Sequence, residues 1–155
     1  SKNPLKLKDK FLEKVKITDL IKINFEKFNS DKKLKISKNS DLEEPEIIYK
    51  DEMMYALSNI IQNAITYSNN LITVELNYYK KNLQIIICDD GNGFSKDIID
   101  KLGEPYISKN NQGMGLGIFI AKNLIENMGG NTNFYNSTEG QAVVEITFEN
   151  SILNI

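Results

Sequence analysis

The sequence predicts an α+β fold of two layers, in which about three helices pack on one face of a mixed sheet of about five strands. Helical and alternating apolar patterns follow one another along the chain, which favours this class over all-α or all-β folds. Two alternating segments, 71–79 and 83–89, are separated by a short polar turn and predict an antiparallel hairpin. The 155 residues suffice for one domain with a sizeable core.

The N-terminal part of the chain changes character near residue 15. Residues 1–14 are Lys-rich with scattered apolar positions, and we expect a linker or the end of a preceding helical domain there, followed by a domain at 15–150. A frayed helix over residues 1–16 is the alternative. A helix is predicted at about 18–29, with Thr18 or Asp19 as its N-cap. Short strands are expected next, at 33–38 and 46–49.

A second helix, from about residue 51 to 68, has two unlike sides on a wheel of about 100° per residue. Apolar side chains cover one broad side, and Asn59, Asn63 and Thr66 lie within about 60° of one another on the opposite side. A merely solvated side would normally carry Lys and Glu, which are stronger helix formers. The two amides and the hydroxyl therefore indicate a ligand site, with simple solvation as the alternative.

The remaining elements come from the second half of the chain. The strand at 83–89 is strongly apolar, and Cys88 within it is interpreted as a small core residue. A third helix is predicted at 115–128, followed by two closing strands at 131–136 and 142–148.

Composition excludes several classes of function. The net charge of −2 does not indicate nucleic-acid binding, and one Cys excludes an internal disulfide or a thiolate zinc cluster. There is no His, which excludes His-dependent catalysis, a His metal site or a phosphorylated His within this chain. No stretch approaches the roughly 20 apolar residues of a membrane span, so no direct membrane contact is predicted. The first residue is Ser, and we expect a piece of a longer protein.

A glycine-rich segment, "DDGNGF", ends the apolar strand. Gly91 and Gly93 can let the backbone approach a flat ligand closely, and Asp89 can accept a hydrogen bond from an exocyclic amine. A plain glycine-rich turn after a strand is the alternative.

A second glycine-rich segment, "GMGLG", precedes the third helix. Gly113, Gly115 and Gly117 would expose backbone N–H groups that favour an anion such as phosphate, whereas a flexible hinge is the alternative. The spacing is not that of the dinucleotide fingerprint, because Ile120 stands where its third glycine would be, and no P-loop is present.

In combination, N-x-x-x-N-A, D-x-G-x-G and G-x-G-x-G resemble the ATP-binding domain of sensor histidine kinases, over about residues 15–149. That domain belongs to the superfamily that includes type II topoisomerase ATPase subunits, the ninety-kilodalton heat-shock chaperones and mismatch-repair ATPases. The resemblance implies the Bergerat ATP-binding fold, with ATP and Mg²⁺ as ligands.

For the polar helix, the resemblance implies that Asn63 ligates Mg²⁺ and that Asn59 supports the metal and the phosphates, so that the two amides form the catalytic pair. Tyr67 would pack near the base.

For the glycine-rich segments, it implies that Asp89 accepts the adenine amino group, while Gly91 and Gly93 let adenine lie against the backbone. Residues 94–112 would form a mobile lid. The residues that would close on the triphosphate are Gly113, Gly115, Leu116 and Gly117.

Position 59 separates the branches of the superfamily. Hydrolases, and kinases that phosphorylate hydroxyl groups, carry a Glu there that acts as a general base, whereas this chain has Asn59, whose amide cannot take a proton. A neutral imidazole is already a nucleophile, so an enzyme that phosphorylates His chiefly positions the γ-phosphate and offsets its charge. Asn59 therefore favours transfer to His over hydrolysis.

Several positions depart from the family pattern. Thr66 replaces the usual Lys, and Lys109 is our candidate for the missing cation, with a solvated Lys as the alternative. The lid has Pro105 and Tyr106 in place of its Phe-rich motif, a feature that resembles redox-responsive global regulatory kinases. Gln141 stands where a Thr is usual in the last hairpin.

The resemblance implies an ATP-dependent protein-histidine kinase domain of a two-component system. Its partners would be a His-containing dimerisation domain of the same parent protein and a response regulator. The domain would be cytoplasmic, in a parent anchored in the inner membrane. A ligand-free docking module and an ATP hydrolase are the alternatives to this function.

Overall fold

The computed structural model describes residues 13–39, 42–104 and 116–155. Its elements, in chain order, are the strand β1 (Lys14–Lys16), the helix α2 (Ile17–Lys27), the strands β2 (Lys33–Lys38) and β3 (Glu46–Ile48), the helix α3 (Asp51–Tyr67), the strands β4 (Leu71–Tyr78) and β5 (Asn82–Asp89), the helices α4 (Lys96–Leu102) and α5 (Leu116–Asn127), and the strands β6 (Asn131–Asn136) and β7 (Ala142–Glu149).

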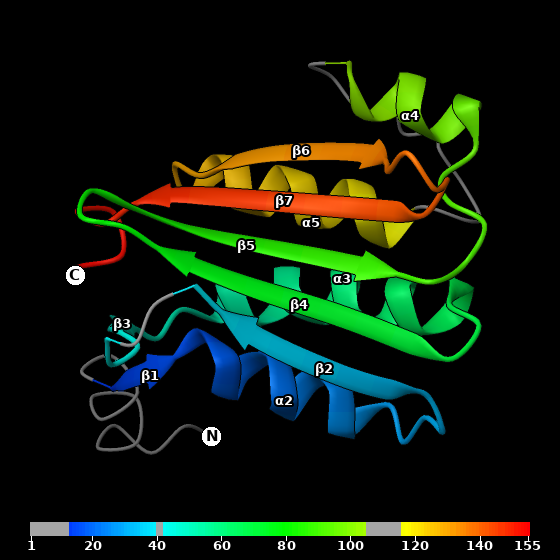
Figure 1. Ribbon diagram of the computed structural model, residues 1–155. Helices are drawn as coiled ribbons and strands as arrows, with labels where there is room; N and C mark the ends of the chain where they lie inside the picture. Colours follow the sequence, from blue (N-terminus) through cyan, green and yellow to red (C-terminus); the bar gives the residue numbers. More distant parts are fainter. Residues whose placement is uncertain (1–12, 40–41, 105–115) are drawn as a thin grey trace, which may run out of the picture.

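The main sheet has five strands in the order β2-β4-β5-β7-β6. β2 runs parallel to β4, and the other neighbours are antiparallel, which makes the sheet mixed. The helices α2, α3 and α5 cover one face, and no helix of the described residues covers the opposite, open face (Figure 1). The predicted two-layer α+β class is confirmed, although the described residues form four helices where about three were expected.

The fourth helix, α4, was not predicted as a helix. It lies within the segment 94–112 that we assigned to a lid, and it stands beyond the edge strand β6 rather than over the sheet (Figure 1). Ser95 supplies its N-cap, because the side-chain oxygen accepts a hydrogen bond from the backbone N–H of Ile98 at 3.2 Å.

Alternation along β5 determines what faces the helices. Leu83, Ile85 and Ile87 point into the core, where each is at most 2% exposed. Cys88 has the opposite parity, so the interpretation of Cys88 as a core residue is wrong, and its side chain is only half-buried on the open face. Burial and the nearby Asp89 carboxylate raise the pKa of the Cys88 thiol.

The long helix α3 follows the predicted pattern closely. Its apolar stripe packs against α2, α5 and the sheet, and its fully or nearly fully buried apolar members are Met53, Ala56, Leu57, Ile60, Ile61 and Ala64. The opposite stripe keeps Asn59 and Asn63 half-exposed and Thr66 exposed. The amphipathic pattern therefore predicted correctly which face of this helix is buried in the core and which face is not.

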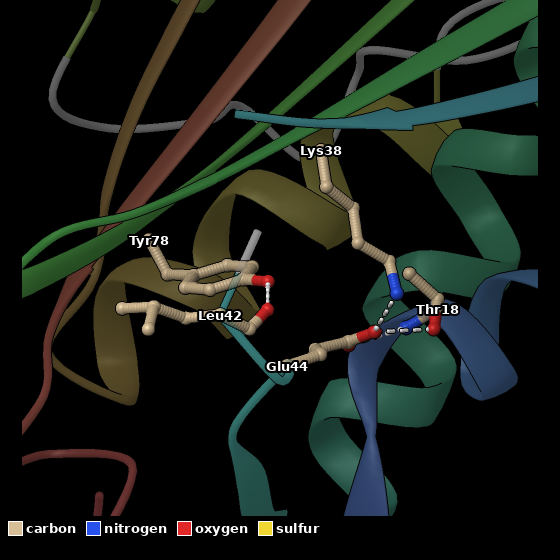
Figure 2. A network of polar contacts seen from close by, with 5 residues as sticks. All are labelled: Thr18, Lys38, Leu42, Glu44 and Tyr78. Atoms are coloured by element: carbon tan, nitrogen blue, oxygen red, sulfur yellow. Dashed lines mark hydrogen bonds and ion pairs between the residues drawn. The ribbon is translucent and has the colours of Figure 1, made fainter. Parts of the chain in front are cut away.

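The start of α2 differs from the prediction. The helix begins at Ile17, and Thr18 lies inside its first turn instead of capping it. The backbone N–H and the hydroxyl of Thr18 both donate hydrogen bonds to the Glu44 carboxylate, at 3.1 and 2.6 Å (Figure 2). The side chain of Glu44 is fully buried and lies 3.5 Å from Lys38 Nζ. A loop carboxylate thus performs the capping role and meets the positive end of the helix dipole.

The same loop is held from the other side by Tyr78, whose hydroxyl donates a hydrogen bond to the Leu42 carbonyl (Figure 2). Directly after it, β3 pairs antiparallel with β1, in register from Lys14 opposite Ile48. β1 falls where a linker or frayed helix was expected, and the domain boundary near residue 15 stays a prediction.

Replacing the buried carboxylate by its amide tests this N-terminal arrangement. Glu44→Gln should lower the free energy of unfolding by about 1–3 kcal/mol, because it removes the negative charge facing Lys38 and the helix N-terminus. Thermal and urea unfolding measure the change. Glu43→Gln, at an exposed neighbour, is the control and should unfold like the parent chain. Equal unfolding of the two variants would contradict the role of Glu44.

Candidate functional site

A cavity of about 260 Å³ opens between α3 and the carboxyl end of β5. Its lining residues come from α3, from the end of β5 and the loop after it, from α4 and α5, and from the start of β7; they are Asn63, Tyr67, Asp89, Asn92, Gly93, Phe94, Ser95, Ile98, Ile118 and Ala142. Asn63 and Asp89, which the sequence singled out in two separate motifs, therefore line the same cavity.

Asp89 continues the inward-facing parity of β5, so its carboxylate points toward the helix layer at the point where the apolar strand ends. The residue is 4% exposed, and its Oδ1 accepts a hydrogen bond from the backbone N–H of Gly91 at 2.9 Å. Burial raises the pKa of Asp89 above its usual range, an effect that the Gly91 hydrogen bond and the positive charge of Lys32 partly offset. Within the described ranges, Gly91 is the only donor to this carboxylate, which leaves acceptor capacity for a ligand.

The two glycines after Asp89 are required by the fold itself. A Cβ at Gly91 would lie 2.0 Å from the Tyr67 carbonyl oxygen, because the backbone of the α3 terminus passes directly against this turn. Gly93 has a φ of +83°, and a Cβ there would lie 2.4 Å from the Gly140 carbonyl oxygen. Both glycines are explained by chain packing, so contact with adenine remains a proposal for them.

A smaller cavity of about 130 Å³ lies beside the first, and its lining residues are Asn59, Gln62, Asn63, Thr66, Tyr67 and Gly117. Asn63 and Tyr67 line both cavities. The Asn59 amide nitrogen donates to the Tyr55 carbonyl at 3.1 Å, and a Cβ at Gly117 would lie 3.0 Å from the Asn59 oxygen. Asn59 is therefore packed against the first turn of α5, and an added side chain at Gly117 would displace it.

The remaining predicted site residues are less well placed. Thr66 donates its hydroxyl to the Gln62 carbonyl at 2.8 Å within its own helix and keeps its oxygen lone pairs available. Leu116 begins α5 and is 46% exposed. The other three, Lys109, Gly113 and Gly115, lie outside the described residues, as does the lid segment from residue 105 onward.

Sequence reasoning missed the apolar wall of the cavity that Asn63 and Asp89 share. Phe94 lines it from the loop after β5, and Ile98, Ile118 and Ala142 line it from α4, α5 and β7. Only Phe94 carried a usable signal, since it directly follows the second glycine of "DDGNGF"; the other three look like ordinary core residues of their elements. An apolar wall with a few polar groups is typical of a small-molecule pocket.

The C-terminal end of α3 is held by Lys32, another residue that sequence reasoning missed. α3 has no basic residue in its last turn. Lys32 Nζ lies in the loop before β2 and donates to the Ile65 and Ser68 carbonyls at 3.1 and 2.5 Å. A cation from elsewhere in the chain thus satisfies the free carbonyls at the negative end of the helix.

Asp90 holds the next turn from the sheet side. Its Oδ1 accepts hydrogen bonds from the backbone N–H groups of Asn69 and Asn70, at 2.7 and 3.0 Å. The side-chain amide of Asn69 donates to the Asp90 carbonyl at 2.8 Å. Partial burial would raise the pKa of Asp90, but the hydrogen bonds from Asn70, Leu71 and Asn69 outweigh it and lower that pKa. Asp90 therefore ties the chain after α3 to the end of β5.

Comparison with known proteins agrees with this geometry. The model of the histidine kinase-, DNA gyrase B- and HSP90-like ATPase family matches residues 49–152, which is more than half of the chain. The chain therefore belongs to this family, and ATP is the nucleotide that the family implies.

Relatives in sequence show which proteins of this family the chain resembles. The chain is 31% identical over 114 residues to the sensor histidine kinase RegB of Cereibacter sphaeroides, covering 66% of this chain and 25% of RegB. It is 32% identical over 150 residues to the heme sensor protein HssS of Staphylococcus aureus strain Newman, covering 92% of this chain and 33% of HssS. The chain thus spans about a quarter to a third of the curated relatives that it matches.

Solved structures show the same fold. The mycobacterial sensor histidine kinase MprB superposes with a TM-score of 0.68 at 19% identity, over 89% of this chain and 97% of that one. The catalytic domain of the histidine kinase ThkA superposes with a TM-score of 0.69 at 19% identity, over 88% and 94%. The family match, the relatives in sequence and the shared fold together identify this chain as an ATP-binding catalytic domain of the sensor histidine kinase type.

Removing the cation at the end of α3 tests how the site is supported. Lys32→Met should lower the free energy of unfolding by about 1–2 kcal/mol, because the Ser68 carbonyl loses its donor and the Ile65 carbonyl keeps only the hydrogen bond from the Ser68 hydroxyl. Denaturant unfolding measures this loss. Lys33→Met, at the exposed neighbouring position, is the matched control. If both variants unfold alike, Lys32 does not stabilise the helix terminus.

Proposed function

We propose that this chain binds Mg²⁺–ATP in the two adjoining cavities and positions the γ-phosphoryl group for transfer to a His on a dimerisation domain of the same parent protein. The observation that carries the proposal is that the half-exposed Asn63 and the buried Asp89 line one cavity with an apolar wall. A flat, mostly apolar base suits this wall, and a buried carboxylate at its end suits the amino group of adenine.

The polar end of the site supports the phosphates and the metal. Asn63 lies where the two cavities meet, and its amide oxygen is a hard neutral donor suited to Mg²⁺, which takes few protein ligands together with phosphate oxygens. Among the described residues, no group of three or more His, Cys, Asp or Glu side chains could hold a metal ion. Asn59 would support the metal and the phosphates from one turn earlier. Bound Mg²⁺ would offset the charge of the phosphates.

The class of reaction is inferred from the residue at position 59. Asn59 is the residue on α3 at which a general base would stand, and its amide nitrogen is engaged with the Tyr55 carbonyl. An amide cannot accept a proton, so this residue cannot activate water or a hydroxyl group. An imidazole acceptor needs no such base, and this supports phosphoryl transfer to His over hydrolysis. We further infer a response regulator as the downstream partner.

The described residues contain no helix long and apolar enough to cross a membrane. We infer a cytoplasmic position for this domain and an inner-membrane anchor elsewhere in the parent protein, by analogy with sensor kinases.

Asp89→Asn tests the assignment of the base contact. The amide oxygen can still accept from Gly91 N–H, but an NH₂ group replaces the second acceptor, so affinity for ATP should fall about tenfold or more and the preference for ATP over GTP should shrink. Isothermal titration with both nucleotides measures this. Asp97→Asn, at an exposed carboxylate on α4, is the control. Unchanged affinity and selectivity in Asp89→Asn would remove Asp89 from the site.

Asn63→Ala tests the metal contact. The variant should lose most of the Mg²⁺-dependent gain in ATP affinity, while adenosine binding, which involves no metal, should stay within about twofold of the parent. Titrations with and without Mg²⁺ give the two numbers. Asn123→Ala, at an exposed amide on α5, should behave as the parent. A Mg²⁺ effect that survives in Asn63→Ala would assign the metal to other ligands.

A further inference from the structure

The amide of Asn136, at the end of the edge strand β6, clamps the backbone of Phe94. Phe94 N–H donates to Asn136 Oδ1 at 2.8 Å, and Asn136 Nδ2 donates to the Phe94 carbonyl at 2.9 Å. One side chain therefore satisfies both backbone polar groups of a residue that belongs to no strand or helix. The contact joins positions 42 residues apart in the chain.

Two further contacts reinforce this clamp. Gly93 approaches Asn136 so closely that a Cβ would lie 2.8 Å from the Asn136 Oδ1. The Phe94 ring meets the buried Phe134 ring edge to face, with centroids 6.2 Å apart and an interplanar angle of 76°. The carboxyl ends of β5 and β6 lie at the same end of the sheet, next to α4 (Figure 1).

The clamped residues also line the cavity that Asn63 and Asp89 share. Gly93, Phe94 and Ser95 line it, and Ser95 then caps α4. Asn136 itself is exposed and does not line either cavity. Its hydrogen bonds therefore act on the cavity only through the backbone of Phe94.

We propose that Asn136 is a positioning residue for nucleotide binding, which fixes the Phe94 wall and the start of α4 against β6 so that the cavity is already formed before a nucleotide enters. This inference rests on the proposed function. Without the clamp, the Gly93–Ser95 turn would become ordered only when the nucleotide binds. The free energy needed for that ordering would lower the affinity. The loss of affinity should be similar for every adenine ligand, because each would contact the Phe94 wall. The metal contact at Asn63 should not change.

The test uses Asn136→Leu, which keeps the approximate size and removes both hydrogen bonds, and Asn136→Asp, which keeps the acceptor for Phe94 N–H and loses the donor. Asn131→Leu and Asn131→Asp, at an exposed position on the other end of β6, are the matched controls. Affinities for adenosine, ADP and Mg²⁺–ATP are measured by isothermal titration at a temperature well below unfolding. Amide hydrogen exchange at Phe94 reports the clamp directly.

We expect Asn136→Leu to weaken all three ligands by a similar factor of about five or more, with a smaller loss in Asn136→Asp and none in the Asn131 variants. The ratio of ATP affinities with and without Mg²⁺ should stay as in the parent, and Phe94 amide exchange should speed up. Should the Leu variant not fold, the Asp variant carries the test with the same signature.

Two negative outcomes are distinct. If the parent chain binds none of the three ligands, the proposed function fails and takes this inference with it. If the parent binds them and both Asn136 variants bind within twofold of it, even with a lowered unfolding temperature, Asn136 serves only stability and the inference is overturned.

Discussion

The close contact between the end of α3 and the turn after β5 is the constraint on which the site depends. Gly91 leaves no room for a side chain against the Tyr67 carbonyl, Lys32 neutralises the helix terminus from one side, and Asp90 binds the following amides from the other. These contacts lock the helix layer to the sheet layer at one edge. Asn63 on the helix and Asp89 on the strand come to share a cavity because this joint sets their separation.

The proposed function assigns different parts of this site to different parts of the nucleotide. The apolar wall from Phe94, Ile98 and Ile118 suits a base, and the half-exposed amide face of α3 suits phosphate and metal. The wall is supported from outside the cavity, through the Asn136 clamp and the Phe94–Phe134 contact. Asp89 lies between them, and burial raises the pKa of its carboxyl group. A hydrogen-bond donor on a ligand would compensate this carboxylate for the hydration that it lost on burial.

Much of the fold was predictable because its signals are local. The 3.6-residue period of α3 and the alternation of β4 identified these two elements and the faces that they bury, and the apolar run at 83–89 identified β5 as a buried strand. Prediction failed where the deciding partner is distant in sequence. Thr18 or Asp19 was expected to cap α2, but both lie inside the helix, and Glu44 binds its first turn from a loop. Cys88 lies in an apolar run, yet the strand parity turns it outward. The Glu44 contact is not encoded in any local pattern, whereas the orientation of Cys88 was missed because an uninterrupted apolar run hides which parity of the strand faces the core.

The sequence by itself determined the class of the protein and the residues of the proposed site, because the two asparagines, Asp89 and the glycines are recognised by their residue type and spacing alone. Only the tertiary structure decided which groups support them. Lys32, Asp90 and Asn136 act through contacts between segments that the chain separates by tens of residues, and hydrogen bonds of that range depend on packing that no local pattern encodes.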